Sequence, residues 1–212
     1  MAKKGPAVRR RGPGKEQVLS SPIPAPRPTA QAFIGVGSNL GDRLLFCREA
    51  VQRLDATPSV RIIHLSSLYE SDPVDYLPQG RFYNAVVEIE TSLSPRDLLA
   101  ACQEIERHLG KRVEIPKGPR TIDLDLLCYR PSDPLDLSHH GVLEEPGLTL
   151  PHPALPDRLF VLLPLAEIAP QWTHPRLHLS AVALLDRLKT PSGVERIAGP
   201  GWEKIPRASN GS

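Results

Sequence analysis

Two aspartates, Asp123 and Asp125, stand two residues apart inside an otherwise apolar run at residues 118–127. If residues 121–127 form a strand, its side chains alternate, so both carboxylates lie on one face and the apolar residues between them on the other. Neighbours on one face of a strand stand roughly 6.6 to 6.8 Å apart, which lets two carboxylates bind one hard cation or flank a pair of them. The preceding Arg120 suits phosphate oxygens beside such a metal. The pattern favours metal-assisted phosphate chemistry, and an exposed aspartate pair of no chemical role is the alternative.

The elements around this run occur in the order strand, helix, strand, strand, helix, strand. This order predicts an α+β fold, the ferredoxin-like split β-α-β arrangement, with an antiparallel sheet, helices on one face and an open face for a ligand. An extra C-terminal hairpin and further helices are expected to follow, with Pro164 bending or splitting one of them. The first predicted strand starts at residue 31, the other strands are 60–69, 82–91, 121–127 and 148–153, and the helices are 44–56, 94–110, 157–168 and 179–188.

Composition divides the 212 residues into three parts. Residues 1–31 carry seven lysines and arginines against one glutamate, with six prolines and few large apolar side chains, so we predict a disordered, basic, proline-rich tail. Residues 32–190 are expected to form one globular domain, and residues 191–212 a C-terminal tail that frays from Gly199 onward. The basic tail has either no specific role or weak contact with nucleic acid or anionic surfaces. The net charge of +2 argues against specific nucleic-acid binding by the whole surface.

The three cysteines, Cys47, Cys102 and Cys128, lie in apolar periodic segments and form no C-x-x-C pair. Cysteines of this kind are small core side chains in a reducing compartment, which predicts a cytoplasmic protein without a zinc site. No apolar stretch has the length of a secretory signal or of a membrane span, so no membrane association is expected.

Glycines between residues 35 and 41 leave two interpretations open. They require close backbone approach or positive φ, but neither a dinucleotide-binding motif nor a phosphate-binding loop with its lysine is complete. This turn therefore either binds phosphate or only redirects the chain. The polar segment at residues 70–81 is similarly either a mobile loop over a site or an irregular surface loop.

Four motifs together resemble the family of 6-hydroxymethyl-7,8-dihydropterin pyrophosphokinases of folate biosynthesis, over residues 33–170. They are Gly-Ser-Asn-Leu-Gly-Asp at 37–42, Phe-Tyr-Asn-Ala at 82–85, Gly-Pro-Arg-Thr-Ile-Asp-Leu-Asp-Leu-Leu at 118–127, and Leu-Pro-His-Pro with Asp-Arg-Leu-Phe between 150 and 160. The resemblance implies transfer of pyrophosphate from ATP to the hydroxymethyl oxygen of the pterin, with attack at the β-phosphorus and AMP leaving. It also implies small-molecule partners only, ATP as co-substrate and the pterin, and we expect a monomer.

The resemblance further implies roles for individual residues. Asp123 and Asp125 match the carboxylates that bind Mg²⁺, and two ions are expected. Arg120, His152 and Arg158 match residues that act on the triphosphate. The other matches to the ATP site are Gln103, Glu106, Leu126 and Thr149, and the matches to the pterin site are Ser71, Val74, Asp75, Phe82, Asn84 and Phe160. Within the pterin site, the amide side chain is expected to read the amide edge of the ring and the two phenylalanines to stack on it.

The chain departs from the family at the loops that close over the site. Pro116 and Lys117 stand where an arginine and a tryptophan are common, and Pro153 replaces an aromatic residue. Either Lys111 or Arg112 is expected to replace one arginine of the basic loop, and closure is expected to be looser.

Two other function classes stay open. One is an RNA-binding module, which the two carboxylates disfavour when no metal is bound. The other is a metal-dependent nucleotidyltransferase, which would release pyrophosphate instead of AMP.

Overall fold

The structure is a computed structural model that describes residues 1, 29–74, 78–112, 118–132, 141–188 and 193–204. The helices are α1 (Arg43–Asp55), α2 (Pro95–His108), α3 (Leu159–Ile168) and α4 (Ala181–Arg187), with the 3-10 turns η1 (Leu155–Asp157) and η2 (Trp202–Lys204). The strands are β1 (Ala30–Ser38), β2 (Val60–Leu65), β3 (Leu68–Ser71), β4 (Phe82–Thr91), β5 (Asp123–Pro131), β6 (Leu143–Glu145), β7 (Leu148–Leu150) and β8 (Val194–Ala198). None of the helices in these ranges is long and apolar enough to cross a membrane.

The main sheet is antiparallel, with the strand order β5-β1-β4-β3-β8, and β2 also pairs with β4. The predicted α+β, ferredoxin-like order of strands and helices is confirmed. One predicted strand, residues 60–69, is divided into β2 and β3. The division falls at Ser66 and Ser67: the Ser66 hydroxyl accepts from the amide of Val86 at 2.9 Å, and the amide of Ser67 donates to the Glu167 carboxylate at 3.0 Å.

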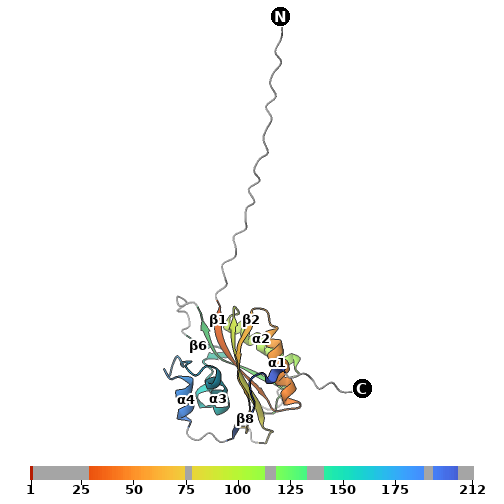
Figure 1. The fold of residues 1–212 in the computed structure, drawn as a ribbon, viewed down its shortest axis with the longest axis vertical. Helices are drawn as coiled ribbons and strands as arrows, with labels where there is room; N and C mark the ends of the chain where they lie inside the picture. The colour runs from red at the N-terminus through yellow and green to blue at the C-terminus, as the bar shows by residue number, and fades with distance from the viewer. Residues whose placement is uncertain (2–28, 75–77, 113–117, 133–140, 189–192, 205–212) are drawn as a thin grey trace, which may run out of the picture.

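The sheet lies between two layers of helices (Figure 1). On one face α1 and α2 cover a core that includes Ile34, Leu98 and Leu126. On the other face α3 and α4 cover a smaller core around Phe33 and Leu127. These helices leave the rest of the second face uncovered beyond the start of α3, and that part holds the pocket described below. Pro164 lies inside α3, so the helix is not split.

The two large helices begin where side chains cap them. Asp42 accepts from the amide of Leu45 at 3.0 Å at the start of α1. Ser94 accepts from the amide of Asp97 at 3.2 Å at the start of α2, and Pro95 occupies its first position. These contacts satisfy amides that have no partner within the helix. All three cysteines are buried, as predicted.

The prediction of a C-terminal tail at residues 191–212 is wrong for its middle part. Residues Val194–Ala198 form β8 on the edge of β3, and Trp202, which follows Gly199, is only 2% exposed. The physical reason is that strand pairing and one large buried aromatic stabilise this segment enough to order it. At the other end β1 begins at Ala30, two residues before the predicted domain. Residues 2–28 lie outside the described residues.

Candidate active site

Asp123 and Asp125 open strand β5 and face away from the α1–α2 core, as the predicted alternation requires. Between and after them, Leu124 and Leu126 are each 3% exposed and pack into that core. The strand begins at Asp123, two residues later than predicted. On the neighbouring strand β1, Gly37 pairs with Asp123, and Gly35 with Asp125. The two carboxylates therefore stand beside a strand that offers no side chain at these positions.

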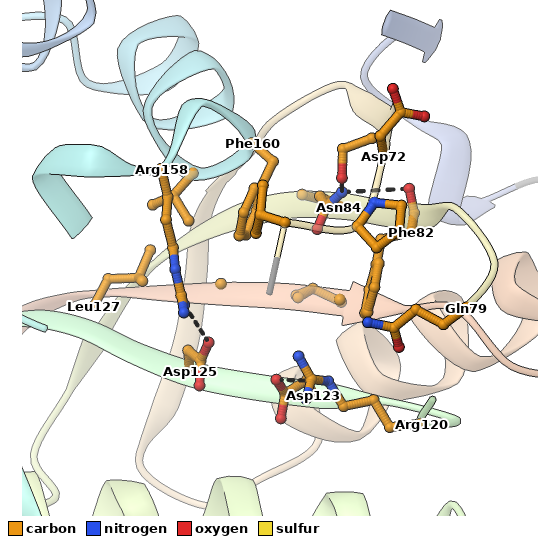
Figure 2. A pocket seen from close by; sticks show the side chains of 18 residues that line it. Asp72, Gln79, Phe82, Asn84, Arg120, Asp123, Asp125, Leu127, Arg158 and Phe160 are labelled. Atoms are coloured by element: carbon orange, nitrogen blue, oxygen red, sulfur yellow. Dashed lines mark hydrogen bonds and ion pairs between the residues drawn. The ribbon is translucent and has the colours of Figure 1, made fainter. Parts of the chain in front are cut away.

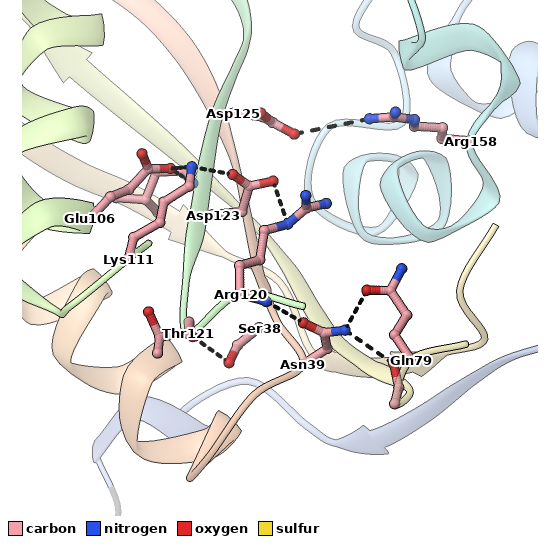
Figure 3. Close-up of polar contacts among 12 residues, drawn as sticks. Ser38, Asn39, Gln79, Glu106, Lys111, Arg120, Thr121, Asp123, Asp125 and Arg158 are labelled. Carbon is pink, nitrogen blue, oxygen red and sulfur yellow. Dashed lines mark hydrogen bonds and ion pairs between the residues drawn. The ribbon is translucent and has the colours of Figure 1, made fainter. Parts of the chain in front are cut away.

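Cationic side chains surround the first carboxylate (Figure 3). Lys111 Nζ lies 2.6 Å from Asp123 Oδ1 and 2.8 Å from Glu106 Oε1. Arg120 Nε lies 3.1 Å from Asp123 Oδ2. The second carboxylate is less tightly held, because Arg158 approaches Asp125 Oδ2 only to 4.0 Å. Either Lys111 or Arg112 was expected to replace an arginine of the basic loop. Lys111 reaches the carboxylates of Asp123 and Glu106, while Arg112 is exposed.

The electrostatics favour added positive charge at the second carboxylate. Burial raises the pKa of Asp125, and the neighbouring charge of Asp123 raises it further. Burial also raises the pKa of Glu106. At Lys111 burial opposes the charge, but the attraction of Asp123 and Glu106 outweighs it, so the pKa of this ammonium is raised. A cation bound between the two aspartates would relieve their mutual repulsion.

The donor set fits Mg²⁺. Within the described ranges no cluster of three or more His, Cys, Asp or Glu side chains could hold a metal, so the two carboxylates have no protein cage around them. Mg²⁺ is usually bound by one or two carboxylates, with substrate phosphates and water completing the octahedron. Asp123 and Asp125 are the residues that would hold it.

A pocket opens above these carboxylates on the uncovered sheet face (Figure 2). Its floor includes Gly35 and Gly37, and its walls include Asn84 of β4 and both predicted phenylalanines. A Cβ atom on Gly37 would lie 3.7 Å from Asn84 Oδ1 and 3.8 Å from Asp123 Cβ. Glycine thus leaves the space between amide and carboxylate open. Both glycines lie within β1, so they do not form a phosphate-binding loop.

The amide of Asn84 is held in one orientation. Its Nδ2 donates to Ser71 Oγ at 2.9 Å and to the Phe82 carbonyl at 3.3 Å. The Oδ1 atom is the one near Gly37, so an acceptor faces the pocket. The phenylalanines each lie beneath a guanidinium: Arg120 stands 5.3 Å from the ring centre of Phe82, and Arg158 stands 5.6 Å from that of Phe160.

A second pocket lies on the other side of Asp125. Its lining includes three residues proposed for the ATP site, Leu126, Thr149 and His152. The amide of His152 donates to the Leu127 carbonyl at 2.7 Å, which ties this segment to β5. Burial lowers the pKa of the His152 imidazole and so favours its neutral form, although Asp125 opposes the shift. Asp125 lines both pockets, so groups bound in the two would meet at this carboxylate.

Known proteins resemble this chain in sequence and in fold. A family model described as 7,8-dihydro-6-hydroxymethylpterin-pyrophosphokinase (HPPK) matches residues 33–170. The chain belongs to this family. The 2-amino-4-hydroxy-6-hydroxymethyldihydropteridine pyrophosphokinase of Bacillus subtilis is 45% identical over 140 residues, which are 66% of this chain and 78% of that protein. The protein of the same name from Methylorubrum extorquens is 39% identical over 168 residues, 79% of this chain and 98% of that protein.

Longer HPPK-containing proteins match as well. The folic acid synthesis protein fol1 of Schizosaccharomyces pombe is 40% identical over 157 residues, which are 74% of this chain but 20% of that protein. A Plasmodium falciparum HPPK-DHPS crystal structure superposes with a TM-score of 0.58 at 17% identity, covering 76% of this chain and 44% of that one. The structural likeness shows that the fold is the HPPK fold.

Two of the described residues proposed for the HPPK substrates stand apart from the two pockets. Gln103 is exposed on α2. Glu106 is 7% exposed, and its Oε1 accepts from the amide of Leu124 at 2.6 Å, so it is occupied within the protein. Asp75 lies outside the described residues. Val74 lines the pocket above the carboxylates, as Phe82 and Asn84 do, and is 63% exposed.

Sequence reasoning missed several lining residues of this HPPK pocket. Gly35 and Gly37 were recognised as sites of close approach, but not as the floor beside the carboxylates. Their spacing of two on a strand was the available signal. Gln79 and Asp72 also line the pocket. Asn39 Nδ2 donates to Gln79 Oε1 at 2.9 Å, and no sequence signal marks that contact.

Proposed function

We propose that this chain transfers pyrophosphate from ATP to the hydroxymethyl group of 6-hydroxymethyl-7,8-dihydropterin in folate biosynthesis. The observation that carries the proposal is its membership of the HPPK family, and two pockets that share Asp125 support it. One pocket has aromatic walls and an amide acceptor, which suit a flat heterocycle. The other contains the histidine and threonine matched to the nucleotide site.

The bond changes follow from the substrates. The hydroxymethyl oxygen attacks the β-phosphorus, the bond from that phosphorus to the α,β-bridging oxygen breaks, and AMP leaves with the bridging oxygen. The hydroxyl proton passes to solvent. Such a transfer depends on positioning and charge neutralisation more than on a strong base. Arg120 and Arg158, which stand over the phenylalanine rings, are suited to pair with phosphate oxygens.

Asp123 and Asp125 are the proposed ligands of two Mg²⁺ ions, which when bound would neutralise the triphosphate. Lys111 and Arg120 neutralise Asp123 in the structure. We infer that, when no metal is bound, the Lys111 ammonium pairs with the carboxylates of both Asp123 and Glu106. Asn84 Oδ1 is the proposed acceptor for an N–H group on the amide edge of the pterin. Ser71, Val74 and Asp75 belong to the segment proposed to complete that edge.

The decisive experiment is incubation of the protein with ATP, Mg²⁺ and 6-hydroxymethyl-7,8-dihydropterin. AMP should appear in a one-to-one ratio with the pterin diphosphate, and no AMP should appear when the pterin is omitted. Release of pyrophosphate would instead indicate nucleotidyl transfer. Stoichiometric RNA binding in Mg²⁺-free buffer, without ATP turnover, would support the binding-module alternative.

We further propose that the catalytic unit is residues 29–204 and that the basic tail is dispensable. Thr29 opens the described part of the fold, and its carbonyl accepts from the amide of Ser132 at 2.8 Å. A chain that starts at Thr29 should keep the full turnover rate, and a large loss would assign the tail to the active enzyme. The three buried free cysteines support a cytoplasmic location. We also expect the enzyme to act as a monomer.

A further inference from the structure

The C-terminal segment 193–204 lies outside the residues matched by the family model, yet it contacts the pterin-side pocket. Strand β8 covers the edge of β3, with Val194 paired to Ser71. One step further, the amide of Asp72 donates to the Gly193 carbonyl at 2.9 Å. Ser71 and Asp72 both line the pocket. The segment therefore fixes the backbone of two pocket residues.

Ser71, whose backbone pairs with β8, is hydrogen-bonded to the side-chain amide of Asn84, which faces the pocket. Its Oγ accepts from Asn84 Nδ2 at 2.9 Å, and both side chains are buried, at 2% and 5% exposure. The hydroxyl helps to hold the Asn84 amide in place, and the Phe82 carbonyl, which can only accept, decides that Oδ1 and not Nδ2 faces the pocket. A shift of Ser71 would loosen the orientation of Asn84.

Asp72 contacts the residue that precedes Phe82, an aromatic residue of the pocket wall. Its Oδ1 lies 2.9 Å from Arg81 Nε, and Arg81 directly precedes Phe82 in the chain. Gly193 has a φ of +82°, and a Cβ atom there would lie 2.8 Å from Asp72 Oδ2. A Cβ atom at this position would force the Asp72 carboxylate, whose other oxygen contacts Arg81, to shift. The glycine is thus needed for contact as well as for backbone conformation.

Trp202 holds the far end of the segment in the core. Its ring is 2% exposed, and its Nε1 donates to the Ser66 carbonyl at 2.9 Å. Arg48 of α1 donates from Nε to the Trp202 carbonyl at 2.9 Å. The turn η2 that carries this tryptophan lies beside α1 (Figure 1). With one end buried under α1 and the other bonded to Asp72, the segment is fixed at both ends.

We propose that the segment 193–204 is a positioning element for the pterin site, and that Gly193 is its positioning residue. It acts through Ser71 and Asp72 on the residues that would contact the pterin. None of its described residues lines the second pocket, which contains Thr149 and His152, although Gly193 and Val194 line a neighbouring hollow with Arg158. The inference rests on the proposed function for its ligand.

The test compares two glycines of the same segment. Gly193→Asn and Gly201→Asn both place a side chain at positive φ, which asparagine tolerates, but a Cβ atom on Gly201 meets nothing within 4 Å. Gly193→Asn should raise the pterin KM about fivefold or more and leave the ATP KM within about twofold. Gly201→Asn should leave both KM values within about twofold of the wild-type values. Thermal melts verify that both variants fold.

Three outcomes would overturn the proposal: an unchanged pterin KM in Gly193→Asn, an equal rise in both KM values, or the same change in Gly201→Asn. A second readout needs no substrate. The Asp72 amide should exchange its hydrogen faster in Gly193→Asn than in Gly201→Asn, and equal protection would also overturn the proposal. If the wild-type protein releases no AMP, the proposed function fails, and the exchange measurement still decides whether the segment holds Asp72.

Discussion

Lys111 Nζ lies between Asp123 Oδ1 and Glu106 Oε1, at 2.6 and 2.8 Å. One ammonium thus joins a carboxylate of the active-site strand to a buried carboxylate of α2. Glu106 also accepts from the amide of Leu124, the residue between the two aspartates. The proposed metal-binding end of β5 is therefore fixed from the α2 side.

The first prediction concerns this pairing. Lys111→Met should lower the free energy of unfolding by about 1–3 kcal/mol, because it leaves the buried Glu106 carboxylate without its cation. The double variant Lys111→Met/Glu106→Gln should recover part of that loss, since the neutral amide still offers an oxygen to the Leu124 amide. Urea denaturation of the wild type, both single variants and the double variant gives the coupling free energy. Equal stability of Lys111→Met and the wild type would contradict the pairing.

Local sequence patterns were enough to predict the central sheet and the strand that carries the two aspartates. Alternation placed Asp123 and Asp125 opposite the core, and Ser94 with Pro95 marked the start of α2. The divided strand at Ser66 could not be predicted in this way, because it depends on Glu167, which is 100 residues away in the chain. Strand β8 was missed because its pattern of exposed and half-buried residues shows no alternation. Its pairing with β3 and the burial of Trp202 order the segment.

The residues of the candidate site likewise fall into two groups: those that local motifs could predict and those that depend on tertiary contacts. The site residues of the compact motifs within the described ranges do line the two pockets. Most of them lie on strands or at the start of α3, while Arg120 and His152 lie in the short connections beside β5 and β7. The sequence could not show which of Lys111 and Arg112 reaches the carboxylates, because this depends on the path of the chain after α2. In the structure Lys111 contacts Asp123 and Glu106. The proposed nucleotide role of Glu106 overlooked its burial. A helix position alone does not reveal that a carboxylate accepts from a strand amide.

The second prediction concerns the carboxylate shared by the two pockets. Asp125→Ala should lower kcat by at least about 100-fold, because it removes a proposed metal ligand where charge must be neutralised. Its unfolding midpoint in urea should not fall, since the substitution also relieves repulsion from Asp123. Asp186→Ala on the exposed side of α4 is the control and should keep full activity. A near-normal rate of Asp125→Ala in saturating Mg²⁺ would rule out the two-carboxylate mechanism.

The third prediction concerns the pocket floor. In Gly37→Ala the new methyl group would meet Asn84 and Asp123 only at ordinary contact distances, so the protein should fold normally. The methyl group projects into the space proposed for the pterin and should raise the pterin KM roughly tenfold or more. Steady-state kinetics with each substrate varied in turn should leave the ATP KM unchanged. Asp186→Ala, on the exposed side of α4, is again the control, and the same KM change there would refute the assignment.

The fourth prediction concerns a histidine far from the pockets. His174 is 4% exposed, and its Nδ1 accepts from the amides of Arg176 and Leu177 at 3.2 and 3.3 Å. Burial, with a smaller contribution from the charge of Arg176, lowers the pKa of its imidazole; the ring of Trp172 packs against it at 5.8 Å. The neutral ring is therefore the form that the folded protein favours.

The sign of the pH effect follows from this. Below about pH 6.5 the unfolded chain binds a proton at His174 that the folded protein resists. The free energy of unfolding should therefore fall as the pH drops through that range. His174→Asn retains an acceptor oxygen for the two amides but cannot become charged, so the decline should be shallower. Urea denaturation between pH 5 and 8 measures both slopes, and the difference between them isolates His174 from the other histidines. Identical slopes would show that the folded protein accepts the proton as readily as the unfolded chain.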